Sequence, residues 1–227
     1  MKKSLLIFLV LAAAAAVIIP YFLLKPAPGK IHYYKVLCMG DSLTESSYGQ
    51  YPRSLKRLFK TGNMKVNVYT AAGPGNTSGE YLNYIKGTDI LKKIKPHIVI
   101  LMLGTNDVRI DGDHTPVKDY VKNMREIIAI IKNHGHPGDR EAMIFLSTIP
   151  PIFHCDLPTF DETSQQRIGE EIVPAINLLA KEENLRLIDL YGFFEKKPEL
   201  LPGIHPGKEG YRAMAELMFA NLRPYIK

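Results

Sequence analysis

Tyr34-Lys35-Val36-Leu37-Cys38-Met39-Gly40-Asp41-Ser42-Leu43 is the stretch from which the architecture of this chain can be read. Its first six residues are mostly apolar and predict a short buried strand. Gly40 and Asp41 then indicate a turn, so Ser42 is expected at the carboxyl end of a first parallel strand. Open α/β sheets bind their ligands at that position. The turn also supplies backbone N–H groups, so a nucleophile and an anion-stabilising donor can share one loop.

The rest of the chain alternates between two kinds of segment. Short apolar runs predict further buried strands at residues 66–69, 98–102, 143–146 and 185–189. Helical spacing of apolar residues predicts helices at residues 51–59, 120–132, 168–183 and 211–222, and Pro174 either splits the third or starts its main part. This alternation predicts an α/β fold, a three-layer α/β/α sandwich with a central parallel sheet of about five strands.

Composition favours an ordinary globular domain. The chain has 227 residues, of which 46% are hydrophobic and 23% are charged, which is enough for one sizeable core. Its formal net charge of +6 includes Lys2 and Lys3, and the other basic residues are scattered, which argues against a nucleic-acid partner. Two cysteines, Cys38 and Cys155, give no disulfide framework.

An apolar segment near the N-terminus has a different character. It runs from Leu5 to Leu24 without a charged residue, which is long enough to span a bilayer as a helix. A cleavable signal peptide has a shorter apolar region, so we favour an uncleaved membrane anchor over a signal sequence at residues 1–24. Residues 25–30 then form a linker, and residues 31–227 form the folded domain. The basic start favours export, with the domain membrane-anchored, secreted or periplasmic.

Small polar residues follow several of the predicted strands. Ser42 follows the first strand, and the glycine-containing segment at residues 71–77 follows the second. Gly104-Thr105-Asn106-Asp107 follows the third strand, and Gly203-Ile204-His205-Pro206 precedes the last helix. Because the carboxyl ends of parallel strands meet at one edge of the sheet, these groups are expected to lie close together.

This set of motifs resembles the SGNH (GDSL-type) hydrolases, a family named for a serine, glycine, asparagine and histidine in separate blocks. Gly40-Asp41-Ser42-Leu43 and Gly104-Thr105-Asn106-Asp107 match the first and third blocks at every position. Gly73 is the counterpart in the glycine block, and Gly203-Ile204-His205-Pro206 is similar to the final block. The resemblance covers residues 35–222 and implies a flavodoxin-like fold and a serine esterase.

The resemblance also implies the role of each residue. Ser42 would be the nucleophile, and His205 the base that activates it and later protonates the leaving alcohol. The oxyanion hole would consist of the Ser42 and Gly73 backbone N–H groups and the Asn106 side-chain amide. Taken singly, Gly73 could serve only a turn, Asn106 could cap a helix, and His205 could be structural.

One position departs from the family pattern. The family usually has an aspartate three residues before the histidine, and Pro202 stands there in this chain. Proline has no side-chain acceptor and cannot orient the imidazole as a carboxylate does. Three explanations remain open. A backbone carbonyl near Pro202 completes a Ser–His dyad, another acid such as Glu199 or Asp189 reaches the ring, or activity has been lost.

The family includes lysophospholipases, thioesterases, arylesterases and carbohydrate O-acetylesterases. Residues 185–222 look most like the carbohydrate-esterase branch, so the expected substrate is a small-molecule or glycan ester, with an acetyl group favoured. A lysophospholipase or thioesterase acting on lipid esters is the first alternative, and an inactive glycan-binding homologue is the second. No phosphate-binding loop, dinucleotide fingerprint or metal-ligand cluster is present, so we expect no cofactor and no metal.

Overall fold

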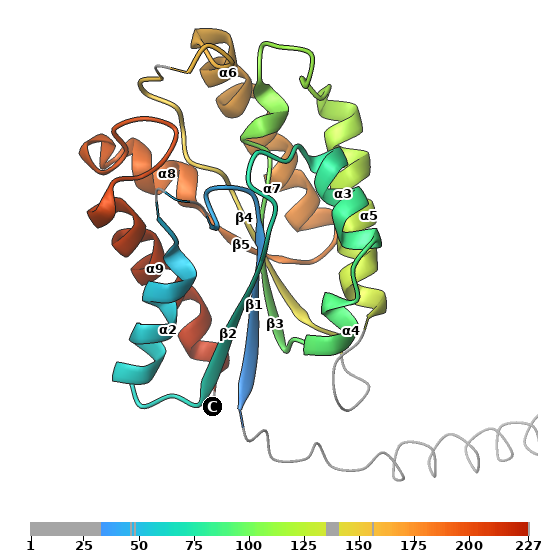
Figure 1. The fold of residues 1–227 in the computed structure, drawn as a ribbon, viewed down its shortest axis with the longest axis vertical. Coiled ribbons are helices and arrows are strands. Elements are labelled where there is room, and N and C mark those ends of the chain that lie inside the picture. Colours follow the sequence, from blue (N-terminus) through green and yellow to red (C-terminus); the bar gives the residue numbers. More distant parts are fainter. Residues whose placement is uncertain (1–32, 46, 48, 135–140, 156, 227) are drawn as a thin grey trace, which may run out of the picture. The chain divides into compact units, whose positions relative to one another are not determined.

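A parallel sheet with strand order β2-β1-β3-β4-β5 forms the centre of this computed structural model (Figure 1). The structure describes residues 33–45, 47, 49–134, 141–155 and 157–226. The strands are β1 Tyr34–Gly40, β2 Val66–Ala72, β3 Ile98–Met102, β4 Met143–Ser147 and β5 Arg186–Ile188. The predicted α/β class and five-stranded parallel sheet are therefore confirmed.

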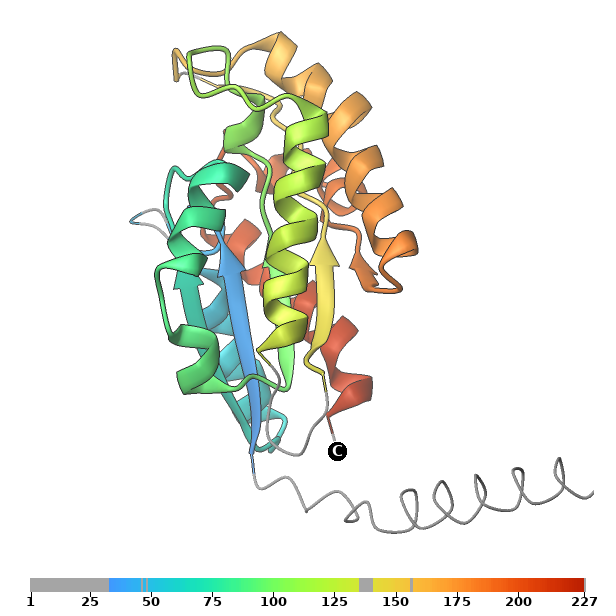
Figure 2. The same ribbon diagram turned by 90° about the vertical axis from the view of Figure 1, so that its right-hand side faces the viewer.

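Helices cover both faces of the sheet. Helices α2 and α9 pack together on one face, and α3, α5 and α7 cover the other, which is turned towards the viewer in Figure 2. The α-helices are α2 Tyr51–Thr61, α3 Ser78–Lys86, α4 Ile90–Ile94, α5 Val117–Asn133, α6 Glu162–Arg167, α7 Val173–Glu182, α8 Leu190–Glu195 and α9 Lys208–Leu222. Short 3-10 turns lie at η1 Asn106–Val108, η3 Pro198–Leu200 and η4 Arg223–Tyr225, and one π-helical turn at η2 Ile168–Ile172.

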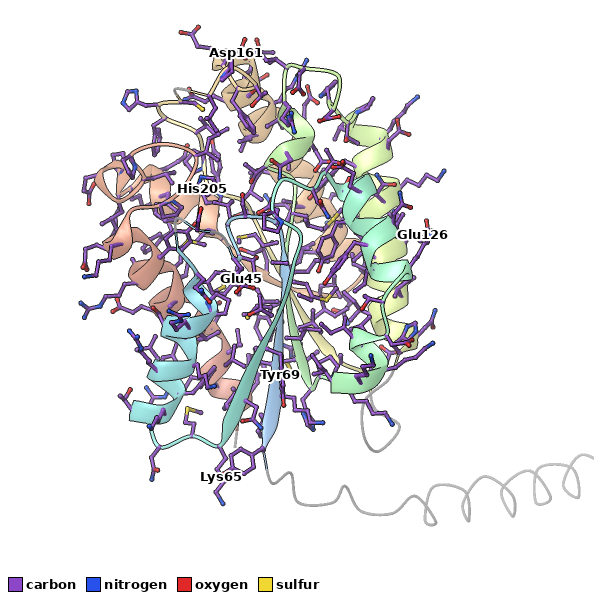
Figure 3. The ribbon with its side chains drawn as sticks, in the orientation of Figure 1. Glu45, Lys65, Tyr69, Glu126, Asp161 and His205 are labelled. Atoms are coloured by element: carbon purple, nitrogen blue, oxygen red, sulfur yellow. The ribbon has the colours of Figure 1, made fainter. Side chains whose placement is uncertain are left out.

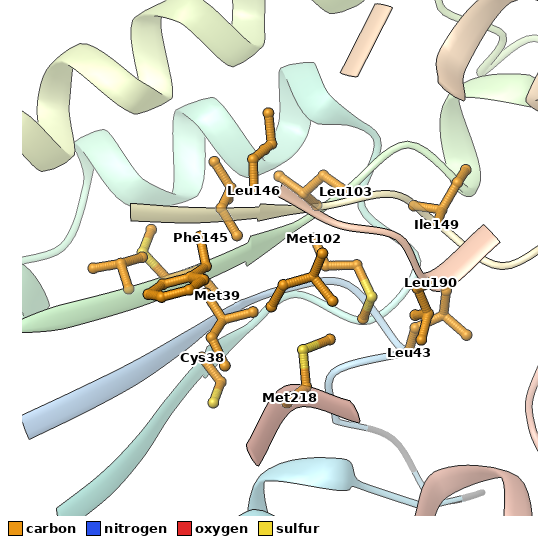
Figure 4. Close-up of a cluster of buried hydrophobic side chains, with 14 of the residues drawn as sticks. Cys38, Met39, Leu43, Met102, Leu103, Phe145, Leu146, Ile149, Leu190 and Met218 are labelled. Atoms are coloured by element: carbon orange, nitrogen blue, oxygen red, sulfur yellow. The ribbon is translucent and has the colours of Figure 1, made fainter. Parts of the chain in front are cut away.

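The burial of the strands explains why apolar runs in the sequence predict them. Strand β3 is buried at every position, and β4 is buried beyond its first residue, because a parallel sheet is covered on both faces. The edge strands β2 and β5 are only partly buried, and their sequences are correspondingly more polar. The buried side chains of β1, β3 and β4 meet those of α8 and α9 in the core shown in Figure 4.

The helical region after β4 differs from the single helix predicted at 168–183. Helix α6, the π-helical turn η2 and helix α7 follow one another there. Pro174 lies in the first turn of α7, so of the two alternatives it starts the main helix. The chain is already helical before it, since the Val173 N–H donates to the Ile168 carbonyl oxygen of η2. Pro174 has no N–H to continue this pattern, so the π-helical turn gives way to the α-helix at the proline.

Helix α3 was not predicted, although the sequence contains its start signal. Thr77 and Glu80 form a capping box, in which each side chain accepts a hydrogen bond from the backbone N–H of the other residue. A threonine followed three residues later by glutamate is the usual signature of this cap. This helix matters for the site because it begins directly after the β2 loop.

Residues His32–Lys227 form one compact unit, which is close to the domain predicted at 31–227. The predicted anchor or signal at 1–24 and the linker at 25–30 lie outside the described residues. Within residues 33–45, 47, 49–134, 141–155 and 157–226, no helix has the length and apolar character needed to cross a membrane.

Candidate active site

Ser42 and His205 meet although they are 163 positions apart in the sequence. The distance between His205 Nε2 and Ser42 Oγ is 2.9 Å. Strand β1 ends at Gly40, two residues before Ser42, and His205 lies in the loop between η3 and α9. Both side chains are partly exposed, and Figure 3 shows His205 beyond the carboxyl ends of the strands, at the opposite end of the domain from Lys65. A substrate can therefore reach the pair from solvent.

The turn that carries Ser42 is held by the aspartate before it. The buried Asp41 accepts a hydrogen bond from the Leu43 N–H at its Oδ1 atom, 2.9 Å away, so the carboxyl group closes the turn around the serine. Burial raises the pKa of Asp41 to about 7, and the nearby carboxylate of Asp107 adds to this. The backbone also needs glycine before Asp41, because a Cβ atom on Gly40 would lie 2.4 Å from the carbonyl oxygen of Met102.

Asn106 enters the site from the neighbouring strand. It begins the 3-10 turn η1, shortly after β3, and its side chain is buried. Its Nδ2 atom donates a hydrogen bond to the carbonyl oxygen of Asn76, at 3.0 Å. A side-chain amide has two N–H groups. The bond to Asn76 fixes the orientation of the amide and uses one of them.

Asp107 ties the loops after β2 and β3 together. Its buried carboxylate accepts hydrogen bonds from the Ser78 N–H at 3.0 Å and from the Ser78 hydroxyl at 2.6 Å. The Ser78 hydroxyl in turn accepts a bond from Asn123 of α5. Burial raises the pKa of Asp107, and the bonds from Ser78 oppose this rise because they favour the charged form. The loop that carries Asn106 is thus fastened to the start of α3.

The glycine loop after β2 differs from what the resemblance implies for Gly73. The Gly73 N–H donates to the Gly40 carbonyl oxygen at 2.9 Å, which commits this donor to the end of the sheet and argues against its role in an oxyanion hole. Gly73, Pro74, Gly75 and Asn76 form a tight turn, closed by a bond from Asn76 N–H to the Gly73 oxygen. Gly75 has a φ of +82°, as expected at the third position of a type II turn with proline at the second.

The backbone N–H groups of Ser42 and Gly75 are the other candidate donors for an oxyanion in these loops. Among the residues that the structure describes, none accepts a hydrogen bond from the N–H of Ser42 or of Gly75. Asn76, which follows Gly75, is bonded through its carbonyl oxygen to Asn106, so the glycine turn and the asparagine are in direct contact. Gly75 was not selected from the sequence, although its Pro-Gly dipeptide is a recognisable turn signal.

The model of the GDSL-like lipase/acylhydrolase family matches residues 38–213 of this chain, which include Ser42, Asn106 and His205. The chain belongs to this family. The resemblance stated from the sequence is therefore confirmed.

Relatives of this chain include an acetylxylan esterase and other esterases. An acetylxylan esterase of Xylanibacter ruminicola is 27% identical over 219 residues, which are 87% of this chain and 45% of the relative. A multidomain esterase of Ruminococcus flavefaciens is 25% identical over 68% of this chain and 19% of its own length. The chain thus spans less than half of either relative. The GDSL esterase/lipase WDL1 of Oryza sativa is 27% identical over 87% of this chain and 80% of that protein.

Solved structures share the fold of this chain. A lipase/acylhydrolase from Enterococcus faecalis superimposes with a TM-score of 0.70 and 24% identity, covering 86% of this chain and 97% of the other. The acetyl xylan esterase AlAXEase superimposes with a TM-score of 0.67 and 24% identity, covering 83% and 99%. The three-layer architecture is therefore the one found in solved acylhydrolases.

Asp189, Glu199 and Pro202 lie in the segment before His205. The Asp189 carboxylate caps helix α8, where it accepts the Gly192 N–H at 2.9 Å, as expected of a residue that only closes a turn. Glu199 lies in η3 with its side chain exposed. Pro202 lines the same cavity as His205 and offers no carboxylate. These three positions therefore supply no recognisable acid for the imidazole.

The electrostatic setting of His205 is that of a neutral base. Burial lowers the pKa of the His205 imidazole below its ordinary value of 6.5, because desolvation disfavours the charged form. A neutral imidazole can accept a proton from the Ser42 hydroxyl. Across the described part of the chain, no three His, Cys, Asp or Glu side chains are grouped as a metal site would require.

Proposed function

We propose that this chain is a serine esterase that removes acyl groups, acetyl foremost, from a carbohydrate. The observation that carries the proposal is the 2.9 Å contact between His205 Nε2 and Ser42 Oγ, with Asn106 at the end of the strand next to that of Ser42. The similarity to an acetylxylan esterase, 27% identical over 87% of this chain, favours a carbohydrate acetyl ester as the substrate.

The proposed reaction uses one imidazole twice. His205 Nε2 accepts the Ser42 proton while Oγ attacks the ester carbonyl, and the same nitrogen then protonates the departing alcohol oxygen. The acyl group remains on Ser42. Water, deprotonated by His205, attacks this acyl-enzyme, and the acid leaves as the serine recovers its proton.

The oxyanion hole that we propose has one member that differs from the sequence prediction. Ser42 N–H and the Asn106 amide keep their predicted roles, and Gly75 N–H takes the place of Gly73 N–H. Two contacts support the exchange, since Gly73 N–H is bonded to Gly40 and the Gly75 turn is bonded to Asn106 through Asn76. Donors that are already positioned lower the energy of the developing oxyanion without reorganisation.

Acyl chain length tests the proposed substrate class. We expect kcat/KM for p-nitrophenyl acetate to exceed that for p-nitrophenyl octanoate at least about tenfold, because a pocket sized for an acetyl group excludes the longer chain. The purified protein should also release acetate from acetylated xylo-oligosaccharides. A preference for the octanoyl ester would contradict the proposal and favour the lysophospholipase or thioesterase alternative.

The pH profile tests the state of the base. Because burial lowers the His205 pKa, the imidazole stays neutral and competent below pH 6.5, and activity is lost only as it becomes protonated at lower pH. We expect the acidic limb of kcat/KM for p-nitrophenyl acetate to have its midpoint below 6.5, the ordinary histidine value. A midpoint above this value would contradict the lowered pKa of His205.

The location of the enzyme stays a proposal from the sequence. Export and membrane attachment through residues 1–24 are consistent with a glycan substrate outside the cytoplasm. Proteinase accessibility of the domain in intact cells would test export, and a domain protected until the membrane is permeabilised would contradict it.

A further inference from the structure

Two neighbouring cavities extend from His205 towards helix α6. The first has a volume of about 300 Å³ and is lined by His205, Leu157 and Pro202 among others. The second has a volume of about 370 Å³ and is lined by residues of α6 and of the segment before it. His154 and Cys155 line both cavities, so the two are adjacent. Figure 3 shows His205 and Asp161, which precedes α6, at the same end of the domain.

The chemistry of the proposed reaction assigns these cavities to one half of the substrate. The ester carbonyl oxygen must point to the oxyanion donors, whereas the leaving oxygen must come within reach of the imidazole that protonates it. The alcohol part of the ester therefore departs on the His205 side. The first cavity, which His205 lines, is next to that side and receives the alcohol rather than the acyl group.

The lining of the second cavity fits a sugar. Phe153 and Phe160 supply apolar surface, and Phe160 is largely buried, so it is a fixed wall. Glu162 and Gln165 are three residues apart on α6 and thus share one helix face, which lines the cavity. Apolar walls with a few polar groups are typical of ligand sites of this volume. The C–H faces of a pyranose ring match the phenylalanines, and its hydroxyl groups match the carboxylate and the amide.

Charge selects among sugars. Asp161 and Glu162 are the acidic residues among the described residues that line the second cavity, and that lining includes His154 but no lysine or arginine. An anionic sugar would place its carboxylate near these two acidic side chains, with no lysine or arginine of the lining to offset the repulsion. A neutral glycan meets no such cost, since carboxylates readily accept hydrogen bonds from hydroxyl groups.

We propose that the two cavities form a single track for the alcohol half of the substrate, a neutral glycan chain, and that Glu162 and Gln165 determine specificity for it. The inference rests on the proposed function, since it takes His205 as the proton donor to the leaving alcohol. The track binds sugar units beyond the one that carries the ester. Small aryl acetates, which lack those units, do not reach α6.

Replacement of both α6 side chains tests the track. The variant is Glu162→Ala with Gln165→Ala, and the matched control is Gln166→Ala, the next residue of α6, which bonds to Glu170 and is not among the cavity residues. The measured quantity is kcat/KM for an acetylated xylo-oligosaccharide divided by kcat/KM for p-nitrophenyl acetate. We expect this ratio to fall about tenfold or more in the double variant, because hydrogen bonds to the glycan are lost. In the control it should change less than twofold.

The outcomes separate the track from the reaction. If the wild-type protein deacetylates the oligosaccharide and the double variant keeps the wild-type ratio, the track is wrong while the esterase stands. If the wild-type protein hydrolyses only p-nitrophenyl esters, or prefers an O-acetylated sialic acid to the neutral oligosaccharide, the neutral-glycan track is wrong. If it hydrolyses none of these esters, the proposed function itself fails.

Discussion

Ser42→Ala is expected to lower kcat for p-nitrophenyl acetate by about 10⁴-fold or more, since loss of a serine nucleophile removes the covalent route entirely. The residual rate would come from binding and from the oxyanion donors alone. Steady-state kinetics on purified protein measures the effect. Thermal unfolding should change little, because Ser42 is partly exposed and its hydroxyl contacts the His205 ring.

A serine elsewhere in the domain provides the matched control. Ser54 lies within helix α2, and Ser54→Ala should leave kcat within about twofold of wild type, as is usual for substitutions away from a site. A fluorophosphonate should label the wild-type protein and not the Ser42→Ala variant. Turnover retained by Ser42→Ala, or label attached to another residue, would contradict the proposed nucleophile. Wild-type protein that neither turns over nor reacts would favour the inactive glycan-binding alternative.

Asn106→Ala should lower kcat by about 10²–10³-fold, the usual cost of removing one oxyanion donor. The loss should fall on kcat rather than on KM, because the donor strengthens its bond only as negative charge develops on the substrate oxygen. Steady-state kinetics with p-nitrophenyl acetate over a range of concentrations separates the two parameters.

The bond from Asn106 to Asn76 requires a control for structural damage. Asn106→Asp keeps the size of the side chain but can donate neither to Asn76 nor to an oxyanion, so the thermal unfolding of both variants is measured beside their kcat. A loss of kcat with an unchanged unfolding midpoint would show that donation to the substrate matters. A structure of the phosphonate adduct of Ser42 would identify the other donors. We expect the phosphoryl oxygen about 2.7–3.1 Å from the Gly75 nitrogen. An oxygen bonded to Gly73 instead, or near-normal turnover in Asn106→Ala, would overturn this arrangement.

Much of the architecture could be predicted from local sequence. Buried parallel strands consist of contiguous apolar residues, so β3 was predicted with its observed bounds and β1 to within one residue. Short helices carry weaker signals, and α6 and α8 were missed for that reason. The start of α3 was available in the Thr77 and Glu80 capping box, which shows that a cap can identify a helix whose periodicity is weak.

The site residues likewise include some that local sequence identifies and one that it does not. Ser42, Asn106 and His205 could be selected because each stands in a short motif at a strand end or before a helix. The choice between Gly73 and Gly75 could not be made locally. It depends on the bond from Gly73 N–H to Gly40, which ends a different strand, and on the bond from Asn106 to Asn76.

The amino-acid order alone determined the α/β class, the strands of the sheet and the groups available for chemistry, because these follow from patterns a few residues long. Only the tertiary structure determined the 2.9 Å contact between Ser42 and His205. It also determined which backbone N–H groups have no acceptor among the described residues at the strand ends, and where the cavities that lead to α6 lie. Each of these depends on atoms contributed by segments far apart in the chain, whose positions are set only when the helices close over the sheet.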